Sequence, residues 1–181
     1  MNVLIACEES QEVCKAFREL GHNAYSCDLQ YPSGGHPEWH VMSDARSISK
    51  RVSHGEDYPE PSIWFSTSDG KFHEVDHWDL LIAHPPCTYL TAASAVRLFN
   101  KDHTIKDMRR YHAGEAAAKF FMSFCEADAD RIAIENPVPL KCFDLPPYSQ
   151  IIEPYMFGDP WRKKNMPVAA GPAEAAPDKC C

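Results

Sequence analysis

The chain has 181 residues, 44% of them hydrophobic and 24% charged, which suits one domain with a proper core and hardly two. No run approaches about 18 apolar residues, and the N-terminus lacks the layout of a signal peptide, so we expect a cytoplasmic protein that does not enter a membrane. The formal net charge of −8 argues against a protein that grips DNA phosphates with its whole surface, so any nucleic-acid surface must be local, supplied by a partner protein, or absent.

The N-terminal part follows a strand–helix–strand pattern. Residues 2–7 form an apolar run that predicts a strand. Residues 11–20 carry apolar side chains at helical spacing, and Gly21 follows where a helix-ending glycine belongs. Residues 23–28 predict a second strand that ends on Asp28, which completes a unit of the size of a βαβ motif.

The next segments continue the alternation of strands and helices. Residues 41–44 predict a short third strand, and the stretch near 62–76 predicts an inserted β-hairpin around a Ser-Asp-Gly turn. Residues 78–83 and 131–134 read as strands buried on both faces, and residues 104–127 between them predict a long helix. The pattern predicts an α/β fold with a mostly parallel sheet and helices on both faces.

Polar or reactive residues directly follow four of these predicted strands. In open α/β sheets, ligands bind in the crevice beyond the carboxyl ends of the strands, so we expect these residues to form one site. They are Cys7 and Glu8, Asp28, the segment from His84 to Cys87, and Glu135 with Asn136.

Cys87 follows two prolines. Pro85 and Pro86 fix the backbone and remove two amide donors, so the chain leaves the sheet as a stiff arm that holds the thiol in place. A rigid, accessible thiol at a cleft is suited to nucleophilic attack. A buried cysteine after a rigid loop explains the same pattern, and both interpretations stay open.

Glu135 and Asn136 form the second reactive segment, and Pro137 follows them. A carboxylate and an amide can read the edge of a base through paired donor and acceptor groups, and a protonated Glu can also donate a proton to a ring nitrogen. A pair that only fixes the loop is the alternative.

Metal and disulfide chemistry are not indicated. The eight cysteines include no C-x-x-C pair, so we expect unpaired thiols that act as small core residues. The nine histidines show no ligand spacing with a partner carboxylate, so we expect no metal site.

Taken together, residues 79–87 and the Ile-Glu-Asn-Pro segment at 134–137 resemble the Pro-Cys and Glu-Asn motifs of the C5-cytosine DNA methyltransferases. The closer resemblance is to small phage-type cytosine methyltransferase-like proteins, which residues 3–8, 26–29 and 154–160 also match. The resemblance covers most of residues 1–164 and implies a single Rossmann-like methyltransferase domain there.

The resemblance also implies roles. Cys87 would attack C6 of cytosine and make C5 nucleophilic toward the methyl group of S-adenosyl-L-methionine, while Glu135 would hold and protonate N3. Arg162 would stand beside the base, and a target in duplex DNA would have to be flipped out. The residues expected at the cofactor are Cys7, Glu8, Ser10, Asp28, Asp44, His84 and Pro85; those expected at the substrate are Pro86, Asn136 and Lys164.

The chain departs from the family in its glycine-free loop at 7–11 and in having no room for a target-recognition domain. These departures leave the size of the expected substrate open: it is DNA, bound directly or through a partner protein, or a cytidine nucleotide. One alternative is a catalytically inert nucleotide- or DNA-binding phage protein on the same scaffold. Another is an exocyclic-amine DNA methyltransferase. The motif of those enzymes has an acid, Asn or Ser before Pro-Pro and an aromatic residue after it. This chain has His84 and Cys87 at those places, which disfavours this alternative.

Two further segments are interpreted from the sequence. Arg97, Lys101, Arg109 and Arg110 give a modest basic face, which we interpret as a solvated helix surface. Residues 165–181 show no periodicity and read as an irregular tail where the resembling proteins carry a Thr-Cys-Leu-Trp-Leu strand. Codons for this tail can be chosen that read Thr-Cys-Leu-Trp-Leu one base along, so we hypothesise a frameshift near residue 164 and incomplete C-terminal strands.

Overall fold

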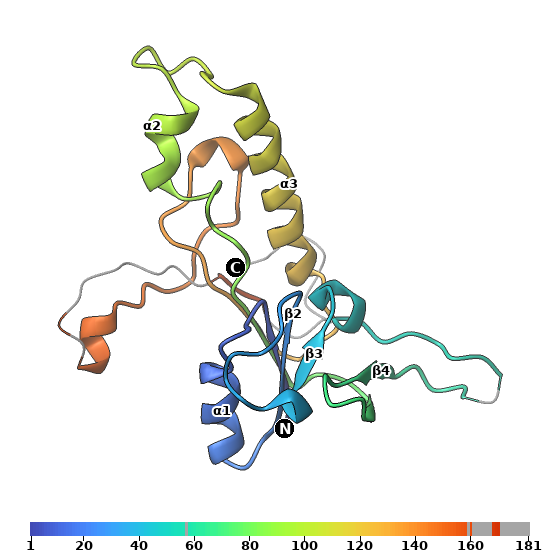
Figure 1. The fold of residues 1–181 in the computed structure, drawn as a ribbon. Coiled ribbons are helices and arrows are strands. Elements are labelled where there is room, and N and C mark those ends of the chain that lie inside the picture. The colour runs from blue at the N-terminus through green and yellow to red at the C-terminus, as the bar shows by residue number, and fades with distance from the viewer. Residues whose placement is uncertain (57, 159, 161–167, 171–181) are drawn as a thin grey trace.

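A computed structural model of the chain describes residues 1–56, 58–158, 160 and 168–170 (Figure 1). Its centre is a six-stranded sheet with the order β3-β2-β1-β6-β7-β8, in which the first five strands are parallel and β8 is antiparallel to β7. The α/β class and the mostly parallel sheet agree with the prediction from the sequence. The strands are β1 (Asn2–Ala6), β2 (Asn23–Asp28), β3 (His40–Met42), β6 (Leu80–Ala83), β7 (Ile132–Ile134) and β8 (Val168–Ala170).

Helices cover both faces of this sheet, as expected. Helix α1 (Glu12–Glu19) packs Cys14 and Phe17 against Val3 and Ile5 of β1. The opposite face carries the larger core, to which α3 (Met108–Cys125) contributes the fully buried Phe121 and Phe124, together with other side chains of the helix. Burying each phenylalanine stabilises the fold by roughly 1.5–3 kcal/mol.

The predicted hairpin is present as β4 (Ile63–Ser66) and β5 (Phe72–Val75), which pair antiparallel in a separate two-stranded sheet. Its anchor is an aromatic contact, since the Phe65 ring lies 4.9 Å from the ring of Tyr25 on β2 in an edge-on arrangement. The segment that leads into β4 extends away from the body of the molecule (Figure 1).

The connection between β6 and β7 forms a helical end that stands out from the sheet (Figure 1). Helix α3 begins at Met108, later than the predicted start at residue 104, because the Asp107 side chain accepts a hydrogen bond from the Arg110 amide (3.0 Å) and caps the helix there. The sequence pattern did not predict α2 (Ala95–Leu98), which is too short to show a period. Five 3₁₀ turns complete the described fold: Pro37–Trp39, Ala45–Ile48, Ala92–Ser94, Lys141–Phe143 and Pro154–Phe157.

The tail is not irregular throughout. Val168–Ala170 form β8 and pair with Ile134, Ala133 and Ile132 of β7. Backbone pairing along the free edge of β7 needs no side-chain period, which is why the sequence pattern gives no sign of it. The remainder of the segment 165–181 lies outside the described residues.

Not all of the described cysteines are core residues, in contrast to the expectation. Cys14 and Cys27 are buried, whereas Cys142 is exposed on the 3₁₀ turn beside α3. In the part of the chain that the structure describes, no helix has the length and apolar character needed to span a membrane.

Candidate functional site

The strand register brings four of the predicted site residues to one edge of the sheet. Ala6 of β1 is paired with Cys27 of β2 and with Ala83 of β6, and Ala83 is paired with Ile134 of β7. The residue that follows each of these four in the sequence therefore lies just beyond the carboxyl edge of the sheet. Those residues are Cys7, Asp28, His84 and Glu135.

This edge contains the point where the strand order reverses, because the chain runs from β1 outward to β2 and β3 and then returns to β6 on the other side. In open parallel sheets, such a switch point leaves a crevice between the loops that leave neighbouring strands in opposite directions. The loops after β1 and β6, which carry Glu8 and Cys87, are the two that meet there.

The loop after β6 holds Cys87 in a fixed position. Pro85 is buried, Pro86 is exposed, and the Cys87 side chain is half-buried. The Cys87 carbonyl accepts hydrogen bonds from the amides of Leu90 (3.0 Å) and Thr91 (3.1 Å), which closes a turn directly after the thiol.

The Cys87 loop and the Glu135 segment run side by side. The Ala92 amide donates to the Val138 carbonyl, and the Leu140 amide donates to the Leu90 carbonyl, both at 2.7 Å. Two backbone hydrogen bonds between these segments keep the thiol loop next to the residues that follow β7.

Three polar atoms at this edge are buried and have no hydrogen-bond partner: His84 Nε2, Glu135 Oε1 and Asn136 Oδ1. Glu135 Oε2 lies 3.9 Å from His84 Nδ1, and the Asn136 amide group donates to the Pro137 carbonyl at 2.6 Å. A buried polar atom without a partner costs roughly 1–3 kcal/mol. Three such atoms just beyond the ends of adjacent strands would therefore gain from a polar partner, which water or a ligand can supply.

Glu8 is engaged by the protein itself. Its side chain is buried, and its carboxylate accepts from the amides of Val13 (2.6 Å) and Cys14 (3.2 Å) in the first turn of α1. Burial raises the pKa of Glu8, an effect that the two amides and the nearby His84 oppose. A carboxylate therefore already satisfies the helix terminus where an anionic ligand group would otherwise bind.

Cys7 and Asp28 lie together at the ends of β1 and β2. Burial, and then the nearby carboxylates of Asp28 and Asp44, raise the pKa of the Cys7 thiol to about 12. Cys7 is thus kept as a neutral thiol and is unsuited to nucleophilic chemistry. Asp28 Oδ1 accepts from the Gln30 amide at 2.9 Å, which leaves its second oxygen available to a ligand.

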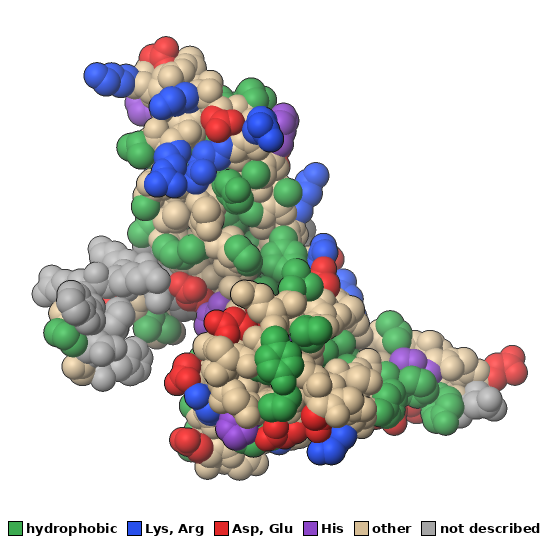
Figure 2. Space-filling view, viewed as in Figure 1, with side chains coloured by type: hydrophobic (Ala, Val, Ile, Leu, Met, Phe, Trp, Pro, Cys, Tyr) green, Lys and Arg blue, Asp and Glu red, His purple; other side chains and the backbone are tan. Residues whose placement is uncertain are grey.

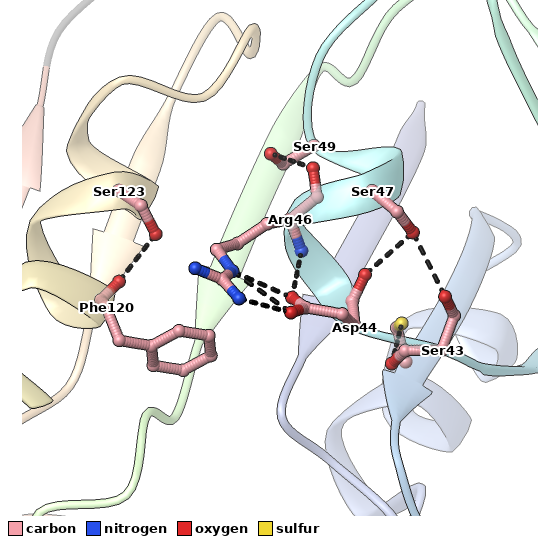
Figure 3. Close-up of polar contacts among 8 residues, drawn as sticks. Ser43, Asp44, Arg46, Ser47, Ser49, Phe120 and Ser123 are labelled. Atoms are coloured by element: carbon pink, nitrogen blue, oxygen red, sulfur yellow. Dashed lines mark hydrogen bonds and ion pairs between the residues drawn. The ribbon is translucent and has the colours of Figure 1, made fainter. Parts of the chain in front are cut away.

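Asp44 does not point a free carboxylate into the crevice. It caps the 3₁₀ turn that follows it, and both of its oxygens accept hydrogen bonds from Arg46, which lowers the pKa of Asp44 (Figure 3). The Arg46 guanidinium also lies 5.1 Å from the ring centroid of Phe120 on α3. In this arrangement, the expected contact of Asp44 with the cofactor would require Arg46 to move.

The loop after β1 is covered by a second loop. Gln11 is fully buried in a left-handed conformation; its side chain donates to the His36 carbonyl (2.9 Å) and accepts from the His36 amide (3.0 Å). Gly34 approaches so closely that a Cβ there would overlap the carbonyl of the half-buried Ser10. The glycine that allows close backbone approach thus lies on the covering loop and not in the segment 7–11.

The residues fit S-adenosyl-L-methionine in part. Asp28 offers a carboxylate oxygen to a ribose diol, and Glu8 supplies a negative charge for the methionyl ammonium group although its oxygens already cap α1. Asp44 is held by Arg46, and Ser10 lies under the covering loop. Of these four residues, only Asp28 keeps a carboxylate oxygen without a described partner, whereas Glu8, Asp44 and Ser10 are engaged or covered within the protein.

A separate group of possible metal ligands lies at the amino edge of the sheet. The ligand atoms of His77, Asp79 and Asp130 lie within 4.8 Å of one another, just before β6 and β7. This grouping was not expected from the sequence. The amide of Asn2 donates to Asp79. The His77 ring is within ion-pair distance of Asp76, Asp79 and Asp130, so contacts within the protein also explain the group.

Arg162 and Lys164, which the resemblance places beside the base, lie outside the described residues. Comparison of the sequence with protein-family models and with curated proteins finds no match.

The structure adds residues to this edge that the sequence pattern did not single out. No sequence motif signals the role of Gln11. The role of Arg46 could have been found, because it stands two positions after Asp44 and the two side chains can form a short-range ion pair. Tyr89 and Arg110 join the Cys87 loop to α3, because Arg110 donates to the Thr88 carbonyl at 3.1 Å and lies 4.9 Å from the Tyr89 ring centroid.

Proposed function

We propose that the protein transfers a methyl group from S-adenosyl-L-methionine to C5 of cytosine in DNA, with Cys87 as the nucleophile and Glu135 as the acid at the base edge. The observation that carries this proposal is the group of three buried, unpartnered polar atoms beside a half-buried thiol on a rigid loop. The Pro-Cys and Glu-Asn motifs that supply these groups support the same chemistry.

The unpartnered atoms suit the edge of a cytosine. Asn136 Oδ1 is an acceptor in the described arrangement, because the Asn136 amide nitrogen donates to Pro137, and a protonated Glu135 offers one acceptor oxygen beside its donating hydroxyl. Cytosine presents a donating N4 amine, and its N3 also donates once protonated. Uracil and thymine present a carbonyl oxygen in place of that amine, which would face an acceptor, so the site favours cytosine.

The proposed reaction balances within these groups. The Cys87 thiolate adds to C6, and Glu135 delivers a proton to N3, so that the electron pair of the ring double bond becomes available at C5. S-adenosyl-L-methionine, when bound, would supply the methyl group as an electrophile, with its sulfur as the leaving group that keeps the electron pair of the broken carbon–sulfur bond. Loss of the C5 proton to solvent and departure of the thiolate from C6 then restore the aromatic ring, and Glu135 regains its proton from N3.

A mechanism-based trap tests the proposal. DNA that contains 5-fluorocytosine should form a covalent adduct with the protein in the presence of S-adenosyl-L-methionine, because fluorine cannot leave C5 as a proton does. The adduct should be absent with Cys87→Ser and retained with Cys142→Ser, since Cys142 is an exposed thiol beside α3. An adduct that survives Cys87→Ser would contradict the assignment of the nucleophile.

A second candidate is a nucleotide- or DNA-binding protein without catalytic activity. The specific observation in its favour is that Glu8 caps α1 and Arg46 holds Asp44, so that the protein satisfies its own cofactor-side carboxylates. Calorimetry with S-adenosyl-L-methionine separates the two candidates. Absence of heat at millimolar cofactor, together with binding of cytosine-containing DNA, would favour the inert protein.

A further inference from the structure

We propose that the helical end of the molecule carries a local binding surface for the phosphodiester backbone of DNA, and we call it the basic lobe. Its residues are Arg97, Lys101, Lys106, Arg109 and Arg110. The inference rests on the proposed function only for the choice of DNA as the polyanion. It replaces the interpretation of these cations as an ordinary solvated helix surface.

Charge is unevenly distributed along the chain. Residues 97–110 contain five cations and the acids Asp102 and Asp107, which gives a net charge of +3, whereas the remainder of the chain carries −11. Figure 2 shows Lys and Arg side chains gathered over the end of the molecule formed by α2 and α3, with acidic side chains concentrated around the sheet. A phosphate-binding surface on an acidic protein has to be localised in this way.

Among the described residues, the cations of the basic lobe are not paired with acids. Arg97, Lys101, Lys106 and Arg109 are exposed, and none of the five forms a salt bridge with an acid in the described part of the chain. The two acids of the segment have other partners: Asp102 accepts from Thr104, and Asp107 caps α3. Elsewhere in the described chain, Lys15, Arg46, Lys50, Arg51 and Lys71 are each paired with a carboxylate. Lys119, Arg131 and Lys141 are exposed without a salt bridge to a described residue, but they do not form a run of cations such as that of residues 97–110.

The backbone of the basic lobe is well defined. The Asn100 amide donates to Thr104 (2.9 Å), and the Lys106 amide donates to Leu98 (2.7 Å), which closes a turn between α2 and α3. Leu98 is buried and fixes this turn to the core. The cations are therefore presented from an ordered surface, so less conformational entropy is lost on binding than for a free chain.

The basic lobe adjoins the proposed nucleophile. Arg110 donates from Nη2 to the Thr88 carbonyl, one residue after Cys87, and its Nε is buried without a partner. A DNA strand that lies along the basic lobe would thus bring its bases to the loop that carries the thiol. This continuity favours DNA over an acidic protein, because only a nucleic acid supplies both the phosphates and the base that the unpartnered acceptors at β6 and β7 require.

Salt-dependent binding of a short cytosine-containing oligonucleotide, single-stranded and duplex, tests this inference. The measurement uses the Cys87→Ser chain without cofactor, so that it does not depend on methyl transfer. Relative to this chain, adding Arg97→Gln and Lys101→Gln should weaken binding at least about tenfold at 0.1 M salt and reduce the slope of log K against log salt by about 2.

The matched control is Lys50→Gln with Lys71→Gln, which makes the same change in net charge at exposed, paired lysines elsewhere on the molecule. The control should retain most of the affinity and the slope. Equal losses in the two double variants, no measurable binding of DNA, or tighter binding of the same sequence as RNA would overturn the proposal. If DNA binding depends on the basic lobe but 5-fluorocytosine DNA forms no adduct with the unmodified chain, the basic lobe is supported and the proposed methyltransferase activity is rejected.

Discussion

The side chains at the carboxyl edge divide into those that the protein satisfies and those that it leaves unsatisfied. Glu8 and Asp44 are acids that accept hydrogen bonds from α1 and from Arg46, whereas Glu135 and Asn136 each keep a buried acceptor without a partner. The unsatisfied residues are therefore those where a ligand gains most by binding.

His40 gives a prediction at the residue scale. Its ring is fully buried; Nε2 donates to the Gln30 carbonyl (3.0 Å), so Nδ1 accepts from the Ser26 hydroxyl (2.8 Å). Burial lowers the pKa of His40, so the folded state stays neutral while the unfolded chain takes up a proton below about pH 6.5. Stability contributed by His40 is therefore present above that pH and is lost as the pH falls toward the lower folded pKa.

The slope of unfolding free energy against pH measures this effect. Between pH 7 and 5, His40 contributes at most about 1.4 kcal/mol per pH unit, and His40→Gln should remove that share while lowering the stability at pH 7.5. His73, whose pKa burial also lowers, is unchanged in both proteins and cancels in the comparison. Identical slopes in urea titrations of the two proteins would rule out a buried neutral His40.

The site could be predicted from the sequence where local pattern and topology agree. Cys87 and Glu135 were placed together because both follow apolar runs, and parallel strands end at one edge of a sheet. The engagement of Asp44 and the cover over Ser10 could not be foreseen, because they depend on side-chain contacts of Arg46 and Gln11 that have no sequence period.

At the scale of elements, segments with an apolar run, a helical spacing or a turn signal were predicted, and those without such a local signal were not. The apolar runs and the spacing of α1 gave β1, α1, β2, β6 and β7 within a few residues. Helix α2 has four residues, too few for a periodic pattern, and β8 depends on the free edge of β7.

The contact between α3 and the 3₁₀ turn at Lys141–Phe143 gives a prediction at this scale. Gly114 is buried in α3, and a Cβ there would overlap the ring of the buried Phe143. Glycine to alanine inside a helix ordinarily stabilises it by about 0.5–1 kcal/mol, but the overlap reverses the sign here. We expect Gly114→Ala to destabilise the protein by about 1–3 kcal/mol in urea unfolding.

A double-mutant cycle separates this overlap from a general defect of the helix. Phe143→Leu removes ring atoms from the contact, so the variant that carries both substitutions should be more stable than the sum of the two single losses implies. Strictly additive losses would show that the ring and residue 114 do not meet.

At the scale of the whole molecule, overall acidity and a local basic lobe have different physical consequences. A net charge of −8 weakens non-specific attraction to nucleic acids, while the uncompensated cations of residues 97–110 preserve attraction at one end. Average composition alone could not reveal this, because the five cations are a minority of the 18 basic residues, and only the fold shows that they form no salt bridge among the described residues.

The frameshift hypothesis for the tail also belongs to this scale and remains a prediction about the gene. If it holds, a reading frame one base along gives Thr-Cys-Leu-Trp-Leu after residue 164, and gene sequencing decides this directly. In the given sequence, Val168–Ala170 already pair with the edge of β7.

The pairing of β8 with β7 leads to a prediction for two shortened chains. A chain that ends at residue 170 keeps β8, whereas a chain that ends at residue 164 leaves the backbone of Ile132–Ile134 unpaired along one edge. A free strand edge is a template for pairing with another molecule. The shorter chain should therefore lose about 1–3 kcal/mol of stability, the net value of a few backbone hydrogen bonds, and should self-associate as its concentration rises.

Urea unfolding and light scattering coupled to size-exclusion chromatography measure the two effects, with the chain ending at residue 170 as the matched control. If both shortened chains unfold at the same urea concentration and elute as the same species, β8 contributes nothing to the sheet, and the edge of β7 is protected in another way.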